Sequence, residues 1–144
     1  MLHVSIDVWA PSHDVFGSVN KRNTRIQCDS GAFCSCVSLQ FYNKFKNKPS
    51  VDPSSSVGNL KAANNVPLDV GLVGTVDLDV VICGISIPVK FYVVRNLSQN
   101  CIVGGPFLEE CGANINYVNK TLSLYENIIT VRYLTTWSLI KHFV

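Results

Sequence analysis

The stretch Asp29-Ser-Gly-Ala-Phe-Cys-Ser-Cys-Val37 begins where a predicted strand, residues 24–28, ends. An aspartate at the end of an apolar strand, followed by Ser and by a Gly that can make a tight turn, presents its carboxylate from a rigid base. Asp-Ser-Gly is also common in ordinary turns, which need no function. Taken alone, the stretch leaves both interpretations open.

The residues around this stretch predict two strands and a short helix. Residues 15–19 and 24–28 form a strand–turn–strand pattern, in which Asn20 and Asn23 supply turn chemistry between the strands. After the apolar residues 33–37, Ser38 is a suitable N-cap for a short helix through Phe45. We therefore expect the Asp-Ser-Gly turn to lie between two extended segments.

The clearest pattern in the chain is an alternation of apolar and polar residues over 75–94, on both sides of Cys83-Gly84. A period of two around a Gly-containing turn predicts a β-hairpin. Residues 101–103 predict a short buried strand, and Pro106 suits the first turn of a helix that ends at Gly112.

The last third of the sequence predicts further strands. Residues 113–117 and 121–125 flank a polar turn and predict a second hairpin. Residues 128–144 are apolar but are interrupted by Arg132 and Lys141, and they fall short of the roughly 20 apolar residues that a bilayer requires. This segment predicts a strand or short helix that packs against another element or a partner chain.

Composition supports a single, mostly β domain. The chain has 144 residues, of which 47% are apolar and 15% charged, and its 20 Val and 10 Ile far outnumber its 5 Ala. A net charge of +2 is too small to indicate binding to the phosphate backbone of a nucleic acid. With no basic leader at the N-terminus, we expect a cytoplasmic protein whose six cysteines are reduced, with no membrane or nucleic-acid partner. Cys34-x-Cys36 lacks a second half-site for zinc, so we expect no metal.

Two segments together resemble the retropepsin family of retroviral and retrotransposon aspartic proteases. Residues 29–35 match its Asp-Thr/Ser-Gly-Ala-x-x-Ser signature, and Cys101-Ile-Val-Gly-Gly-Pro-Phe-Leu108 is similar to its later segment of two apolar residues, Gly and a helix start. The resemblance implies an all-β fold: a small closed β-barrel-like acid protease monomer with one short C-terminal helix. It also implies a domain over 15–126, an N-terminal extension over 1–14 and an apolar tail over 127–144.

The resemblance also implies roles for individual residues. Asp29 would be the catalytic aspartate, Ser30 the hydroxyl that links two subunits, and Gly31 with Ala32 the turn beside the substrate. The remaining residues implied for the site are supporting residues and a substrate-covering flap: Ser35, Ile102, Val103 and Gly104 for support, and Ala62, Ala63, Asn64, Asn65 and Val66 for the flap.

The function implied is an aspartic-type endopeptidase that needs no cofactor. One carboxyl acts as base on a water while a second, protonated carboxyl donates to the substrate carbonyl. Two such carboxyls share a proton and titrate as a pair. The sequence has one Asp-Ser-Gly, so we expect a homodimer with Asp29 from each copy, acting on a polypeptide substrate and derived from a retrotransposon polyprotein.

Two other interpretations stay open from the sequence. Cys34 or Cys111 with His13 or His142 would make a thiol nucleophile and base, although no local signature supports the pairing. The same fold would also serve as a dimerisation or peptide-binding module with weak or no catalysis.

Overall fold

The structure is a computed structural model that describes residues 5–53 and 71–143, with side chains for 12–53 and 71–135. These residues form ten strands and two short helices. In chain order they are β1 Ser5–Val19, β2 Arg22–Cys28, β3 Cys36–Ser38, α1 Leu39–Tyr42, β4 Leu72–Ile82, β5 Ile85–Val94, β6 Cys101–Val103, α2 Gly105–Glu110, β7 Asn114–Asn116, β8 Thr121–Leu124, β9 Ile129–Arg132 and β10 Leu134–Phe143.

Seven strands form one sheet in the order β10-β1-β2-β6-β3-β5-β4. The far end of β1 also pairs with β4, with Ser18 opposite Val81 and Val19 opposite Val80. This pairing closes the sheet on itself and leaves β10 outside the closed part. The predicted all-β, barrel-like architecture is therefore confirmed.

The long hairpin of β4 and β5 supplies much of the barrel core. Its turn, Cys83-Gly84, has positive φ at both residues (51° and 74°), the geometry that two-residue hairpin turns require. Every second residue faces inward, and burial of each large apolar side chain contributes about 1.5–3 kcal/mol. The inward residues are Val76, Leu78, Val80, Ile82, Ile87, Val89, Phe91 and Val93. The predicted hairpin is confirmed.

The first hairpin and the first helix differ from the prediction in their ends. β1 and β2 are joined by Asn20 and Lys21, both with positive φ, so the turn is two residues long rather than four. The Ser38 hydroxyl accepts a hydrogen bond from the Phe41 N–H at 3.0 Å, as expected of an N-cap. The helix ends at Tyr42, since the Asn43 N–H is the last to donate four residues back, and the amides of Lys44 and Phe45 donate to carbonyls three residues back.

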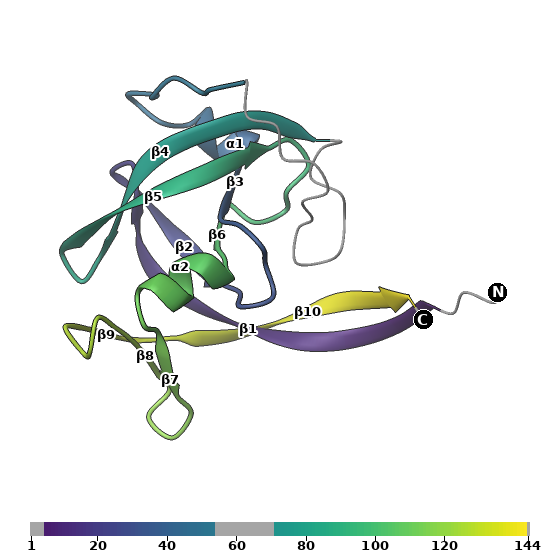
Figure 1. Cartoon of the computed structure of the whole chain (residues 1–144), viewed down its shortest axis with the longest axis vertical. Helices are drawn as coiled ribbons and strands as arrows, with labels where there is room; N and C mark the ends of the chain where they lie inside the picture. Colours follow the sequence, from purple (N-terminus) through teal and green to yellow (C-terminus); the bar gives the residue numbers. More distant parts are fainter. Residues whose placement is uncertain (1–4, 54–70, 144) are drawn as a thin grey trace.

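A second, three-stranded sheet has the order β7-β8-β9. Figure 1 shows it on the side of α2 that faces away from the barrel. Phe107 and Leu108 of α2 and Leu122 and Leu124 of β8 belong to the same apolar core as the barrel. The helix ends at Glu110, and Gly112 takes the positive φ (58°) that favours glycine after a helix. The predicted helix and second hairpin are confirmed.

β1 and β10 form one long two-stranded ribbon that extends from the barrel (Figure 1), with Ser5 opposite Phe143 and Asp14 opposite Leu134. The apolar segment at the C-terminal end therefore contains a strand, one of the two predicted alternatives. β1 is continuous across residue 14, where the predicted N-terminal extension meets the predicted domain. The domain boundaries at 14/15 and 126/127 stay predictions. Within the described residues, no helix has the length and apolarity needed to cross a membrane.

Candidate active site

The loop of residues 29–35 is held at the end of β6. β2 runs parallel to β6, with Cys28 opposite Val103, and β3 runs antiparallel to β6, with Cys36 opposite Ile102. The segment that joins β2 to β3 must therefore reverse direction beside Gly104, immediately after β6. This topology brings together the two segments that the sequence singled out.

Backbone hydrogen bonds fix Asp29 at the start of this loop. Its N–H donates to the Val103 carbonyl at 3.0 Å, and its own carbonyl accepts from the Ala32 N–H at 3.2 Å. The Gly31 N–H donates to the Asp29 Oδ1 at 2.9 Å. The carboxylate is half-buried and points from a turn whose backbone is tied to the strand beside it.

Gly104 and Gly105 let two backbone segments touch. A Cβ atom at Gly104 would lie 2.6 Å from the Cys34 carbonyl oxygen and 2.8 Å from that of Ala32. The Gly104 N–H donates to the Ser35 Oγ at 3.1 Å, and the Gly105 N–H donates to the Ala32 carbonyl at 2.8 Å. Any larger residue at position 104 would push the loop away from β6.

The other predicted site residues divide into three groups. Ala32, Ser35, Ile102 and Val103 are buried beneath the loop, where they pack and hold it. Ser30 and Gly31 are exposed on its outer side. The flap residues 62–66 lie outside the described residues. The roles predicted for all of them stay predictions.

The Cys28 thiol, at the base of the site, is buried and lies near two carboxylates. Cys28 directly precedes Asp29, and its burial, with the charges of Asp14 and Asp29, raises the pKa of its thiol to about 12. The thiol is therefore neutral at physiological pH and packs as a small apolar group.

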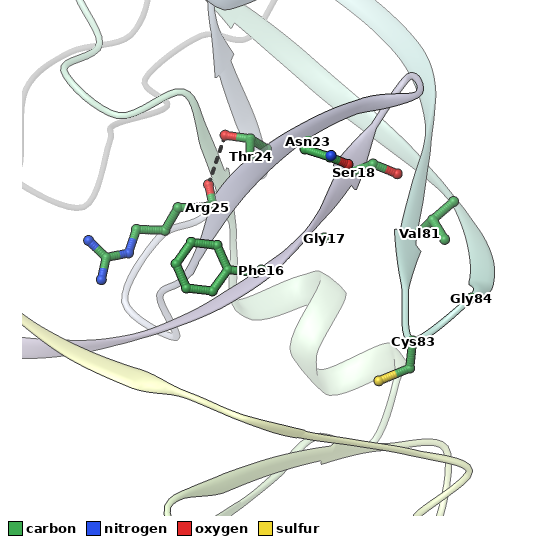
Figure 2. Close-up of a pocket in the computed structure, with 9 residues that line it drawn as sticks. All are labelled: Phe16, Gly17, Ser18, Asn23, Thr24, Arg25, Val81, Cys83 and Gly84. Carbon is green, nitrogen blue, oxygen red and sulfur yellow. Dashed lines mark hydrogen bonds between the residues drawn. The ribbon is translucent and has the colours of Figure 1, made fainter.

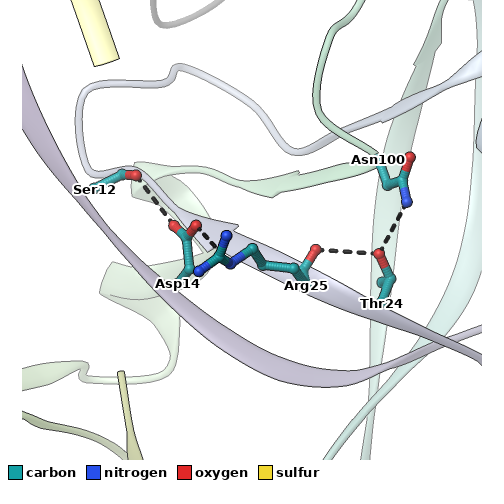
Figure 3. Close-up of polar contacts among 5 residues, drawn as sticks. All are labelled: Ser12, Asp14, Thr24, Arg25 and Asn100. Atoms are coloured by element: carbon teal, nitrogen blue, oxygen red, sulfur yellow. Dashed lines mark hydrogen bonds and ion pairs between the residues drawn. The ribbon is translucent and has the colours of Figure 1, made fainter. Parts of the chain in front are cut away.

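Behind the site, a polar network joins β1, β2 and the segment before β6 (Figure 3). The buried Asp14 carboxylate accepts from the Ser12 Oγ at 3.1 Å and pairs with the Arg25 Nε at 3.2 Å. Thr24 Oγ1 donates to the Arg25 carbonyl and accepts from Asn100 Nδ2, each at 3.2 Å. Sequence reasoning missed this network, because a buried aspartate resembles a surface one until its partner strand is known.

The described contacts of His13 and Cys111 are with tyrosines rather than with each other. His13 makes edge contacts with the rings of Tyr133 and Tyr117, at centroid distances of 4.6 Å and 5.8 Å. The Cys111 Sγ lies 3.3 Å from the Tyr125 hydroxyl. His142 lies where side chains are not described. Across the described residues, no cluster of three or more His, Cys, Asp or Glu side chains is placed to hold a metal ion.

A pocket of about 630 Å³ lies elsewhere, between β1, β2 and the β4–β5 turn. Figure 2 shows Phe16 beside Arg25 on one wall and Cys83 on the opposite one. None of the described residues predicted for the site lines this pocket. It is therefore separate from the Asp29 loop.

Phe33 and Gly105 are two residues of the loop region that sequence reasoning missed. The Phe33 side chain is 65% exposed and follows the buried Ala32, so it offers an apolar surface four residues after the carboxylate. Gly105 holds the Ala32 carbonyl through its N–H. An apolar residue directly after a Gly-Ala turn is the signal that would have indicated Phe33.

Comparisons with known proteins give matches by structure. No family model matches the sequence, and no curated protein matches it. The retroviral protease-like domain of Ddi1 from Leishmania major superposes with a TM-score of 0.68 at 21% identity, covering 85% of this chain and 90% of its own. The fold is retropepsin-like.

Two further structures share the retropepsin-like fold. EIAV protease, solved in complex with the inhibitor HBY-793, has a TM-score of 0.55 at 18% identity, covering 72% of this chain and 90% of its own. A retropepsin-like aspartic protease from Rickettsia conorii has a TM-score of 0.50 at 17% identity and covers 81% and 89% of the two chains. The retropepsin-like fold thus accounts for most of this chain.

Proposed function

We propose that the protein is an aspartic endopeptidase whose active form is a homodimer with one Asp29 from each copy. The observation that carries the proposal is the place of Asp29, on a turn that follows β2 and is hydrogen-bonded to Val103 at the end of β6, within a retropepsin-like fold. Similarity to EIAV protease and to a retroviral protease-like domain supports an origin in a retrotransposon polyprotein.

Two copies are needed because the reaction uses two carboxyls in different protonation states. The ionised Asp29 takes a proton from a water whose oxygen attacks the scissile carbonyl carbon, while the protonated Asp29 of the second copy donates to the carbonyl oxygen. Collapse of the tetrahedral intermediate breaks the C–N bond, and a carboxyl returns a proton to the leaving amine. The Gly31 N–H supports this role, because its hydrogen bond to Oδ1 fixes the direction of the carboxylate.

The substrate class proposed is an extended polypeptide with apolar side chains near the scissile bond. The exposed Phe33 ring beside the Asp29 turn supports this class. Contact with an apolar side chain would remove both surfaces from water, which favours binding.

The deciding experiment compares wild type with Asp29→Asn on a mixed peptide library at mildly acidic pH. Asparagine keeps the shape of the side chain but has no carboxyl, so we expect the rate to fall by about 10³-fold or more. Asp77→Asn, which changes an exposed carboxylate on β4, is the matched control and should cleave at the wild-type rate. Light scattering on each variant confirms that the assembly state is unchanged.

Equal cleavage by wild type and Asp29→Asn would exclude Asp29 as the catalytic group. A wild-type protein that is dimeric but cuts nothing would instead favour a dimerisation or peptide-binding module with the same fold.

A further inference from the structure

Two cysteines lie in contact at the end of the Asp29 loop, Cys34 within the loop and Cys36 at the start of β3. The Sγ atoms of Cys34 and Cys36 are 3.6 Å apart, and the Cys36 Sγ also lies 4.0 Å from the Cys34 carbonyl oxygen. Both residues are buried, with 8% of Cys34 and 3% of Cys36 exposed, in a small apolar cluster with Val94. The proposed peptidase reaction uses neither thiol.

The environment makes the two thiols chemically unequal. Cys34 is the more exposed of the two, and the hydrogen bond between the thiols, in which either sulfur can be the donor, lowers the pKa of Cys34. The same bond, together with burial, raises the pKa of Cys36. A thiolate is the reactive form of cysteine, so Cys34 is the better nucleophile and Cys36 the neighbouring thiol that can trap its oxidised form.

We propose that Cys34 and Cys36 form a redox-active dithiol that a peroxide oxidises to a disulfide between the Asp29 loop and the start of β3. The Cys34 thiolate attacks a peroxide oxygen, the O–O bond breaks, and the departing hydroxide takes up a proton, which leaves a sulfenic acid on Cys34. The Cys36 sulfur then attacks the Cys34 sulfur, the S–O bond breaks, and the hydroxide leaves as water with the Cys36 proton. The two sulfurs together lose two electrons to the peroxide.

Closing the disulfide must move the loop. The sulfurs have to approach from 3.6 Å to about 2.05 Å. The residue between them, Ser35, is held on both sides, since its Oγ accepts from the Gly104 N–H at 3.1 Å and its carbonyl accepts from the Tyr92 N–H at 2.9 Å. Strain from closure is therefore passed to the Gly104 contact that holds the Asp29 turn against β6.

The effect on peptide cleavage rests on the proposed function, whereas the dithiol chemistry does not. The first measurement is therefore the disulfide itself. Wild type is treated with hydrogen peroxide, remaining thiols are alkylated, and the unfolded chain is cleaved before aspartates, which releases residues 29–51 with Cys34 and Cys36 as their only cysteines. We expect this peptide to lose two hydrogen atoms in mass and to escape alkylation.

Single variants test the order of the steps. In Cys36→Ala, oxidation should stop at a Cys34 sulfenic acid that dimedone labels, and in Cys34→Ala neither product should form at these positions. Cys83→Ala, which removes the exposed cysteine of the β4–β5 turn, is the matched control and should form the disulfide as wild type does. A peptide 29–51 that keeps both thiols while Cys83 is oxidised would overturn the proposal.

The second measurement is the rate of peptide cleavage before and after oxidation, which reports whether the Asp29 loop has moved. A displacement of about 1 Å at a positioning element can cost about 10²-fold in rate, so we expect at least a 10-fold loss of cleavage on oxidation, reversed by dithiothreitol. Each variant is compared with itself before and after peroxide, and Cys34→Ala should be insensitive.

Hydrogen exchange of residues 29–35 is measured in parallel in Asp29→Asn, where it should accelerate on oxidation whether or not the wild type is a peptidase. Absence of cleavage before oxidation would refute the proposed function alone. A disulfide that changes neither cleavage nor exchange would overturn the proposed coupling.

Discussion

Gly104 is the residue at which the site has least room. A Cβ there would lie 2.6 Å from the Cys34 carbonyl, so we expect Gly104→Ala to lower the free energy of unfolding by about 1–3 kcal/mol, as overpacking does, and to reduce cleavage. Gly71→Ala is the control, because its Cβ would meet the Val94 side chain at an ordinary 3.5 Å. Urea unfolding measures both. Equal losses in the two variants would contradict the close approach at Gly104.

Phe33 tests the proposed contact with substrate. Phe33→Ser removes an exposed apolar side chain, and full burial of such a side chain contributes about 1.5–3 kcal/mol. We therefore expect KM for peptides with apolar side chains to rise about 10-fold, while kcat changes little. Phe16→Ser is a matched control, because Phe16 is 64% exposed but lines the separate pocket. Steady-state kinetics on one apolar peptide decide the matter; a similar rise in KM for both variants would contradict the assignment.

The sequence predicted the position of Asp29 better than its surroundings. The resemblance implied that residues 102–104 support the site, and the register of β2 and β3 on β6 brings residues 29–35 and 101–104 together. The burial of Asp14 and the sulfur contact of Cys34 with Cys36 were not expected. Both depend on which strands become neighbours, and local sequence does not specify this.

At the scale of elements, His13 joins the barrel to the second sheet. It lies on β1, and its ring contacts Tyr117 beyond β7 and Tyr133 before β10. Burial lowers its pKa below the ordinary 6.5, more strongly than the nearby Asp14 carboxylate raises it.

This shift predicts acid sensitivity. The unfolded chain binds a proton at His13 more readily than the folded protein, so stability present above pH 6.5 is lost as the pH falls through that value towards the lowered pKa. We expect the Tm to fall from pH 7 to pH 5, and to fall less in His13→Phe, which keeps an aromatic ring but cannot be protonated. Calorimetry at both pH values measures the difference; the same fall in both proteins would contradict the role of His13.

Elements with strong local patterns were predicted most fully, whereas the N-terminal part of β1, whose partner is distant, was not predicted. Alternation and a Gly turn identified β4 and β5 because both strands pair with their sequence neighbour. The N-terminal part of β1 has no such neighbour. Its partner is β10, more than a hundred residues later, and Pro11 interrupts the alternation that would have indicated a strand.

At the scale of the whole molecule, the proposed function requires two copies of the chain. If each active site needs Asp29 from two copies, a mixed dimer of wild type and Asp29→Asn is inactive.

Mixing the two proteins measures this directly. With a threefold excess of Asp29→Asn and full subunit exchange, about one wild-type subunit in four finds a wild-type partner, so activity should fall about fourfold. The same excess of a protein that cannot exchange, such as Asp29→Asn crosslinked beforehand, should leave the activity unchanged. An undiminished rate in the first mixture would show that one chain suffices.

The parallel pairing of β2 with β6 also sets the order of events during synthesis. β2 is complete at Cys28, but the strand that holds the Asp29 turn ends only at Val103, and the ribbon has no second strand until β10. Contacts between such distant segments close late, because the intervening chain must lose its freedom first. A nascent chain therefore leaves the ribosome with its aspartate on an unsupported loop. The proposed activity is delayed until translation has passed most of the sequence and two finished copies have met.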